Sequence, residues 1–195
     1  MKIIHVIVGL EQGGAENSLY NLIMESGNDD NEHIVISLTD KGFYGSKFNE
    51  IGVDCYCLGM PRRIPTVSGC FKLFKLIKKY KPEIVQTWMY HSDLIGGIIA
   101  KFAGVKKIYW GIHNFNIDLN VTPFTTVLTV RICAIFSYFI PNKIIICSKE
   151  SISVHKKIGY KNIFEIINLG YNLTELKFNE QLKSSTRKKW NLKKN

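Results

Sequence analysis

Apolar and polar residues alternate along the chain in blocks of two different lengths. The shorter blocks are largely apolar runs, as expected for strands buried on both faces of a parallel sheet. They cover residues 3–8, 33–38, 53–58, 83–87, 107–110, 143–147 and 163–167. The longer blocks carry apolar residues at helical spacing, which predicts helices. These helices are expected over residues 14–27, 66–81, 93–103, 122–139 and 149–158.

The alternation of strands and helices predicts an α/β fold, a Rossmann-like parallel sheet of about seven strands with helices on both faces. In such sheets the binding crevice lies beyond the carboxyl ends of the strands. Functional residues are therefore expected in the segments that directly follow strands. These segments are residues 9–16, 88–93, 111–118, 148–151 and 168–172.

The composition fits a folded chain and bounds its domains. Of 195 residues, 46% are hydrophobic and 22% are charged, which is too apolar for intrinsic disorder. The length allows one substantial domain. We expect this domain over residues 1–178 and a basic linker or tail over residues 179–195, because the apolar periodicity fades after Phe178.

The cysteines and the first residues both favour a cytoplasmic location. The number of cysteines, five, is odd, which indicates a reducing compartment with free thiols. They form no C-x-x-C pair, so we expect no metal site. Residues 1–10 lack the basic region, long apolar run and small-residue cleavage site of a secretory signal peptide. Secretion is therefore not expected.

The net charge of +10 is unevenly distributed. Residues 177–195 hold seven lysines and arginines against one acid, Glu180, and so carry +6. Residues 55–82 hold seven more basic residues and no acid. A basic chain invites binding to nucleic acid or to an anionic membrane. Because the excess inside the fold is one local cluster, we expect an anionic membrane surface as partner and no nucleic acid.

Two predicted helices bear on the membrane. The helix over residues 66–81 is amphipathic and basic, which suits either an anionic leaflet or a solvated helix packed on the sheet. Residues 121–140 are long enough to span a bilayer, but Arg131 lies near the middle. A buried or membrane-leaning helix is therefore expected there. Together these helices predict peripheral association with the inner face of the cell membrane.

The loop after the first strand is the first candidate site. Gly13 and Gly14 precede a helix, where exposed N–H groups and the helix dipole favour an anion such as phosphate. The G-x-x-x-G-G spacing is neither a dinucleotide fingerprint nor a Walker A motif. A tight strand-to-helix turn is the alternative explanation of the glycines. Glu16 in the first helical turn either faces the substrate or complements the dipole.

Further candidates follow the fourth, fifth and sixth strands. His91 suits hydrogen bonding to a sugar, and Asp93 suits either that role or the N-cap of the next helix. His113 and Asn114 could contact substrate, with His113 as an acid or base, although a lone histidine also serves structural roles. Ser148 is a substrate contact or an N-cap. No hydrolytic triad or nucleophile elbow is evident.

The ordered set of these motifs resembles the N-terminal half of a GT-B fold glycosyltransferase of the retaining family 4. The similar segments are GLEQGGAE after the first strand, DLIGGIIAKFAGV, WGIHN, IIICSKES and IINLGYNLTELKF, which cover about residues 1–178. The resemblance implies transfer of a sugar from a nucleotide-sugar donor to a saccharide or lipid-linked acceptor, as in surface polysaccharide biosynthesis. It implies no metal and no cofactor, since helix N-termini and basic side chains meet the phosphate charge.

The resemblance also assigns roles to residues. Gly13 and Gly14 would lie against the donor phosphate and the transferring sugar, and His113 would be the catalytic contact to donor sugar or acceptor. Acceptor-side contacts are implied for the remaining candidates. These are Glu16, His91 and Ser148, while Asn114 is a candidate substrate contact. The chain departs from the family where Gln86 and Trp88 replace histidines after the fourth strand, and where Asn168-Leu169-Gly170 replaces an Asn-Gly turn.

Family members hold most of the donor site in a second domain, with two glutamates separated by seven residues, and this sequence contains no such pair. We therefore expect a truncated or split enzyme whose C-terminal donor-binding domain is supplied in cis or in trans, and whose isolated chain has negligible activity. The alternative is a non-catalytic acceptor-binding or membrane-docking subunit. A nicotinamide-dependent oxidoreductase is a third hypothesis, supported only by Thr39-Asp40 after the second strand.

Overall fold

The computed structural model describes residues 1–28, 30–62, 64–113, 122–170 and 177–192. Seven parallel strands form a sheet in the order β3-β2-β1-β4-β5-β6-β7. The strands are β1 (Lys2–Ile7), β2 (Glu32–Ser37), β3 (Asp54–Cys57), β4 (Ile84–Trp88), β5 (Lys107–Ile112), β6 (Lys143–Ile146) and β7 (Phe164–Ile166). The order reverses between β1 and β4, as in doubly wound sheets, where ligands bind at that point. The predicted Rossmann-like fold is confirmed.

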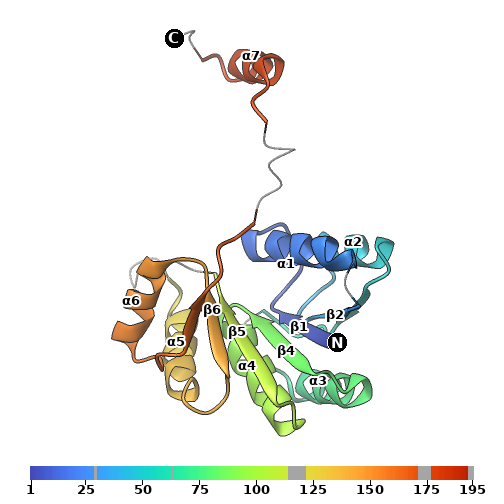
Figure 1. Cartoon of the computed structure of the whole chain (residues 1–195), viewed down its shortest axis with the longest axis vertical. Helices are drawn as coiled ribbons and strands as arrows, with labels where there is room; N and C mark the ends of the chain where they lie inside the picture. Colours follow the sequence, from blue (N-terminus) through green and yellow to red (C-terminus); the bar gives the residue numbers. More distant parts are fainter. Residues whose placement is uncertain (29, 63, 114–121, 171–176, 193–195) are drawn as a thin grey trace.

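Helices cover both faces of this sheet (Figure 1). They are α1 (Gly14–Glu25), α2 (Tyr44–Glu50), α3 (Val67–Tyr80), α4 (Tyr90–Phe102), α5 (Phe124–Phe136), α6 (Lys149–Ile158) and α7 (Glu180–Lys189), with a 3-10 turn at Ser26–Asn28. Figure 1 shows α1 and α2 on one face and α3, α4 and α5 on the other. The helix α7 lies apart from the sheet and buries none of its residues.

Each face of the sheet has its own apolar core. Under α1 and α2, Leu19 and Phe48 pack on Val35 and Trp88 of the sheet. The larger core lies on the other face, where the central strands pack against α3, α4 and α5. The side chains alternate between the faces along each strand. This alternation sends Trp88 to the α1 side of β4.

A glycine pair lets α4 approach the sheet closely. A Cβ added to Gly97 would lie 2.6 Å from Nε1 of Trp110, which is fully buried. A Cβ added to Gly96 would lie 3.0 Å from Cγ2 of Thr87 and 3.1 Å from Cγ1 of Val6. All three distances are shorter than ordinary contacts between non-bonded heavy atoms. Packing therefore favours glycine at both positions, and most strongly at Gly97.

The structure differs from the sequence-based prediction at four helices. The helix α7 forms within residues 179–195, where a linker or tail was expected. The helix α2 was not predicted, because it has only seven residues and buries few of them, although Phe48 is fully buried. The helix α4 begins at Tyr90 and not at Asp93. The helix α5 is shorter than the predicted 122–139. Across the residues described above, no helix is both long and apolar enough to cross a bilayer.

Candidate functional site

The point where the strand order reverses brings two predicted segments together, the loop after β1 and the loop after β4. The β1 loop leads into α1 through Gly13. The β4 loop leads into α4 through Met89, whose φ of 72° and ψ of 155° are strained for a residue with a side chain. The backbone N–H of Met89 donates to the carbonyl of Gly111 at 2.9 Å. This bond ties the β4 loop to the end of β5, where His113 follows.

Neither Gly13 nor Gly14 is required by backbone conformation or by packing. Gly13 is the N-cap of α1 with a φ of −157°, which is extended backbone open to any residue. A Cβ on Gly14 would have no atom within 4 Å, and one on Gly13 would meet the flexible carboxylate end of Glu16. Both glycines are exposed. A tight turn therefore does not explain the pair. The backbone at the start of α1 carries no side chain at these two positions, and the flexible carboxylate of Glu16 lies beside it; a side-chain-free helix N-terminus is what anion binding needs.

Glu16 lies in the first turn of α1, folded back toward Gly13. Burial raises the pKa of its carboxyl group. Burial also raises the pKa of Tyr44, with Glu16 as the next largest cause, so the two side chains share one environment. The Tyr44 hydroxyl donates to Oδ1 of Asn17 at 3.0 Å. This position allows Glu16 to complement the helix dipole and also places a carboxylate at the edge of the open N-terminus.

His113 is held by an aromatic stack. Its ring lies flat on Trp88, with 4.8 Å between ring centroids and 12° between planes. Its Nδ1 lies 3.5 Å from Sγ of Cys147. Burial lowers the pKa of His113 to about 4. The imidazole is therefore neutral near pH 7 and offers one N–H donor and one acceptor nitrogen.

Behind Trp88 runs a chain of hydrogen bonds that sequence reasoning missed. The indole N–H of Trp88 donates to Nδ1 of His5 at 3.3 Å, and Nε2 of His5 lies 3.0 Å from Nδ1 of His33. Nε2 of His33 in turn lies 3.0 Å from Oγ of Ser26, which donates to the carbonyl of Ile23 at 2.9 Å.

An indole only donates, so His5 accepts at Nδ1 and carries its proton on Nε2. The same logic places the proton of His33 on Nε2, which then donates to Ser26. Burial, followed by the proximity of His33, lowers the pKa of His5 to about 3. This series of hydrogen bonds thus fixes the orientation of Trp88, and the stack on Trp88 in turn fixes the ring of His113. Its signal in the sequence is a histidine inside the otherwise apolar β1 run.

His91 lies in the first turn of α4 and lines a small hollow with Val8, Thr39 and Met60. The structure therefore gives His91 a different set of neighbours from His113.

The N-cap alternative for Asp93 is wrong. The side chain is fully buried inside α4, where Oδ1 accepts from the Thr87 hydroxyl at 2.5 Å. Burial raises its pKa well above the usual value, although Thr87 and the backbone of Gly111 act in the opposite direction. Asp93 therefore belongs to the packing of α4 on the sheet.

The remaining predicted residues lie after β5 and β6. Ser148 is the N-cap of α6 and its Oγ accepts from the backbone N–H of Ser151 at 3.3 Å. The capping alternative is confirmed, and a substrate contact stays a prediction. Asn114 lies outside the described residues. No group of three or more metal-ligating side chains occurs in the part of the chain that the structure describes.

Known proteins share this fold and this sequence pattern. The sequence matches the model of Glycosyltransferase Family 4 over residues 12–175. No curated protein matches it. Among solved structures, Anabaena Alr3699/HepE in complex with UDP matches with a TM-score of 0.76 and 14% identity, over 98% of this chain and 50% of that one.

Two further structures show how widely the fold is used. Acinetobacter baumannii MurG matches with a TM-score of 0.57 and 12% identity, over 87% of this chain and 46% of that one. The UDP-GlcNAc 2-epimerase of Methanocaldococcus jannaschii matches with a TM-score of 0.52 and 15% identity, over 86% and 45%. The chain thus spans about half the length of these proteins. Identities this low show the fold alone, which does not specify the chemistry.

Proposed function

The chain belongs to Glycosyltransferase Family 4, and from this premise we propose that it forms the acceptor-side half of a retaining glycosyltransferase. The reaction would transfer a sugar from a nucleotide-sugar donor to a saccharide or lipid-linked acceptor in surface polysaccharide biosynthesis. The observation that carries this proposal is the exposed pair Gly13 and Gly14, which neither backbone conformation nor packing explains. It opens a helix N-terminus at the point where the strand order reverses.

In this proposal the donor phosphate meets the N-terminus of α1. The backbone N–H groups at Gly13 and Gly14 and the positive end of the helix dipole stabilise the phosphate charge. A side chain at either glycine would stand between the backbone and the phosphate. HepE has been solved with UDP and with UDP-glucose bound, which supports a nucleotide-sugar donor for this family member too. Neither metal nor cofactor is part of the proposal.

His113 would be the catalytic contact to the transferring sugar or the acceptor. A neutral imidazole both donates and accepts, so it matches a sugar hydroxyl without adding charge. The stack on Trp88 fixes the ring plane and limits its rotation. Glu16, His91 and Ser148 are proposed acceptor-side contacts, and Asn114 is a proposed substrate contact. Precise placement of His113 contributes to rate because reacting groups then need no reorganisation.

A second domain would complete the enzyme. The matched structures are about twice as long as this chain, and most of the donor site is proposed to reside in the other half. That half is supplied either in the same polypeptide or by a separate protein. The isolated chain is accordingly expected to have negligible transferase activity.

Peripheral association with the cytoplasmic leaflet is the proposed location. The helix α3 buries Leu73 and Ile77 against the sheet and presents exposed lysines outward. These lysines are Lys72, Lys75, Lys78 and Lys79. Beside them Phe71 is 56% exposed, with Nζ of Lys75 lying 4.4 Å from its ring centroid. Lysines around an exposed aromatic ring suit an anionic lipid surface.

The test is sugar transfer by the chain alone and by a fusion that joins it to the half of HepE it does not match. Labelled nucleotide sugars are the donors, and an extract of membrane lipids and saccharides is the acceptor pool. We expect label in acceptor from the fusion only, with at least a tenfold loss on His113→Ala and no loss on the exposed control Lys156→Gln. Robust turnover by the chain alone would contradict the need for a second half. A fusion that binds UDP but transfers nothing would contradict the transferase role.

A further inference from the structure

A half-open apolar groove of about 860 Å³ lies between α5 and α6, away from the glycine pair. Its volume falls within the range of about 300–1,000 Å³ that is usual for small-molecule sites. The walls are mainly aliphatic. They include Val127, Val130, Ala134 and Ile135 of α5 with Val154 and Ile158 of α6. Such a lining offers few partners for the hydroxyl groups of a sugar or for a nucleotide base.

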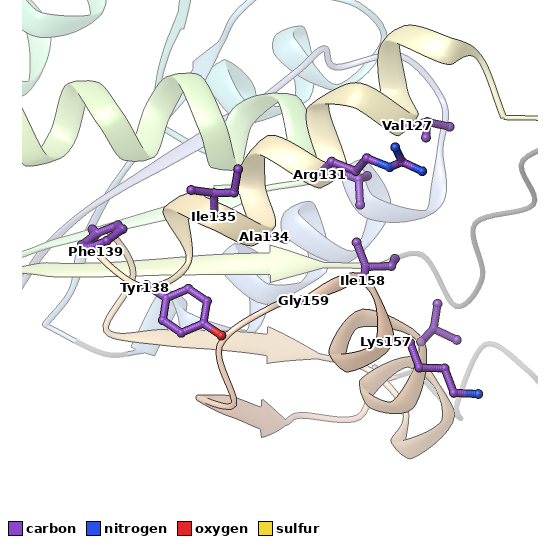
Figure 2. Close-up of a pocket in the computed structure, with 11 residues that line it drawn as sticks. Val127, Arg131, Ala134, Ile135, Tyr138, Phe139, Lys157, Ile158 and Gly159 are labelled. Atoms are coloured by element: carbon purple, nitrogen blue, oxygen red, sulfur yellow. The ribbon is translucent and has the colours of Figure 1, made fainter.

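The charged side chains of the groove are both cationic. Arg131 of α5 and Lys157 of α6 line it, and no acid does. Neither cation forms an ion pair with an acid among the residues described by the structure. Figure 2 shows the two cations at the same end of the groove, with Tyr138 and Phe139 at the other end. The site is therefore apolar along its length and positive at one end.

The groove opens onto an apolar surface. Among the residues that line the groove, Ile135 is 65% exposed and Phe139 is 71% exposed. Large apolar side chains gathered on one surface mark an interaction site. The strand arrows beside the groove in Figure 2 point toward its cationic end, so that end faces the carboxyl edge of the sheet, where the candidate site lies.

We propose that the groove holds the hydrocarbon chain of a lipid phosphate, with the phosphate between Arg131 and Lys157. This inference rests on the proposed function, in which it selects a lipid-linked acceptor over a free saccharide. The lipid phosphate would direct its attached saccharide toward His113. An amphiphile with one anionic end fits an apolar trough with one cationic end, whereas a protein helix would have to supply acids at that end alone.

The experiment measures binding of dodecyl phosphate to the full chain by titration calorimetry, below the concentration at which the probe forms micelles. Dodecanol and inorganic phosphate serve as the two halves of the probe. We expect dodecyl phosphate to bind at least tenfold more tightly than dodecanol, and inorganic phosphate to give no measurable heat. Joint substitution of Arg131→Gln and Lys157→Gln should remove the preference for the phosphate ester.

Matched variants separate the groove from the general surface. Lys156→Gln removes a neighbouring exposed lysine that does not line the groove, and should leave binding unchanged. Ile135→Glu should abolish uptake, whereas Leu128→Glu, on the same helix and outside the groove, should preserve it. Thermal unfolding of each variant checks that the chain is folded.

Three outcomes would overturn the proposal. Equal affinity for dodecanol and dodecyl phosphate would remove the role of the cations. Equal loss in the groove variants and their controls would place binding elsewhere. Uptake of neither amphiphile would assign the groove to another protein segment or to a bilayer surface. The assay contains no nucleotide and no sugar, so its failure is distinct from a failure of UDP binding at α1 or of sugar transfer.

Discussion

This chain contains two Gly-Gly pairs, one at the start of α1 and one inside α4. They look alike in sequence, but the structure explains only one of them by packing. Gly96 and Gly97 lie inside α4, where a Cβ would collide with Val6, Thr87 or Trp110. Gly13 and Gly14 begin α1, where a Cβ would meet open space or one flexible carboxylate. The first pair is explained by packing, and the second is not. A small residue that the fold does not need is a candidate for binding, and this contrast selects the N-terminus of α1.

The largest expected effect is at the packed pair. Gly97→Val would force a branched side chain against the buried indole of Trp110. Overpacking of this kind lowers the free energy of unfolding by about 2–3 kcal/mol. Urea unfolding of wild type and variant measures the difference. A stability equal to wild type would show that α4 can move away from the sheet, and the contrast between the two pairs would then be lost.

The next largest effect is on stability and comes from His5 in β1, the strand that precedes Gly13 and whose Val6 lies next to Gly96. The pKa of His5 is about 3 in the folded chain and 6.5 ordinarily. Below pH 6.5 the unfolded chain takes up a proton that the folded chain excludes, so stability is complete above pH 6.5 and falls as the pH drops toward 3. The loss is about 2 kcal/mol between pH 6.5 and pH 5.

Urea unfolding at a series of pH values measures this loss, with His5→Phe as the comparison. The variant should be less stable at pH 7, because Trp88 and His33 lose a partner, and its stability should depend less on pH. An unchanged pH dependence would show that burial does not keep His5 unprotonated. The proton positions assigned to the hydrogen bonds from Trp88 through His5 to His33 would then be wrong.

The smallest effect is at Ser148, a polar residue that the fold does explain. Ser148→Ala removes the hydrogen bond to the N–H of Ser151 and should lower the free energy of unfolding by about 1 kcal/mol. Ser148→Asp retains a capping oxygen and should restore most of that stability. If Ser148→Ala left stability unchanged, the cap would no longer account for this serine, and its proposed acceptor contact would gain weight.

The elements that could be predicted from the sequence are those built around buried apolar residues. Strands such as β1 and β6 could be predicted because largely apolar runs, interrupted in β1 by His5, have few alternatives to a buried parallel strand. The helix α2 could not, because it contributes only a few buried residues between two loops. The start of α4 was misplaced because a polar residue before an apolar run resembles an N-cap, whereas Asp93 is buried and the helix begins after the strained Met89.

The candidate site was predictable in location and not in contacts. The loops after strands placed Gly13 and His113 at the carboxyl edge of the sheet, where the structure has them, because parallel strands share that edge. His113 stacks on Trp88, and Trp88 donates a hydrogen bond to His5. These residues lie after β5, at the end of β4 and in β1, three elements that are distant in sequence. Such contacts depend on strand order and register, which the hydrophobic pattern alone does not contain.

The most direct test of the account is a titration with UDP of the chain fused to the half of HepE that it does not match, followed by the amide resonances of Gly13, Gly14 and Ala15. We predict that these amides shift, and that Gly14→Val weakens UDP binding at least tenfold while changing the free energy of unfolding by less than about 0.5 kcal/mol. Gly27→Val, at the other end of α1 and equally uncrowded, should bind as wild type does. Shifts confined to other regions, or equal affinity in Gly14→Val and wild type, would contradict a phosphate site at this glycine pair.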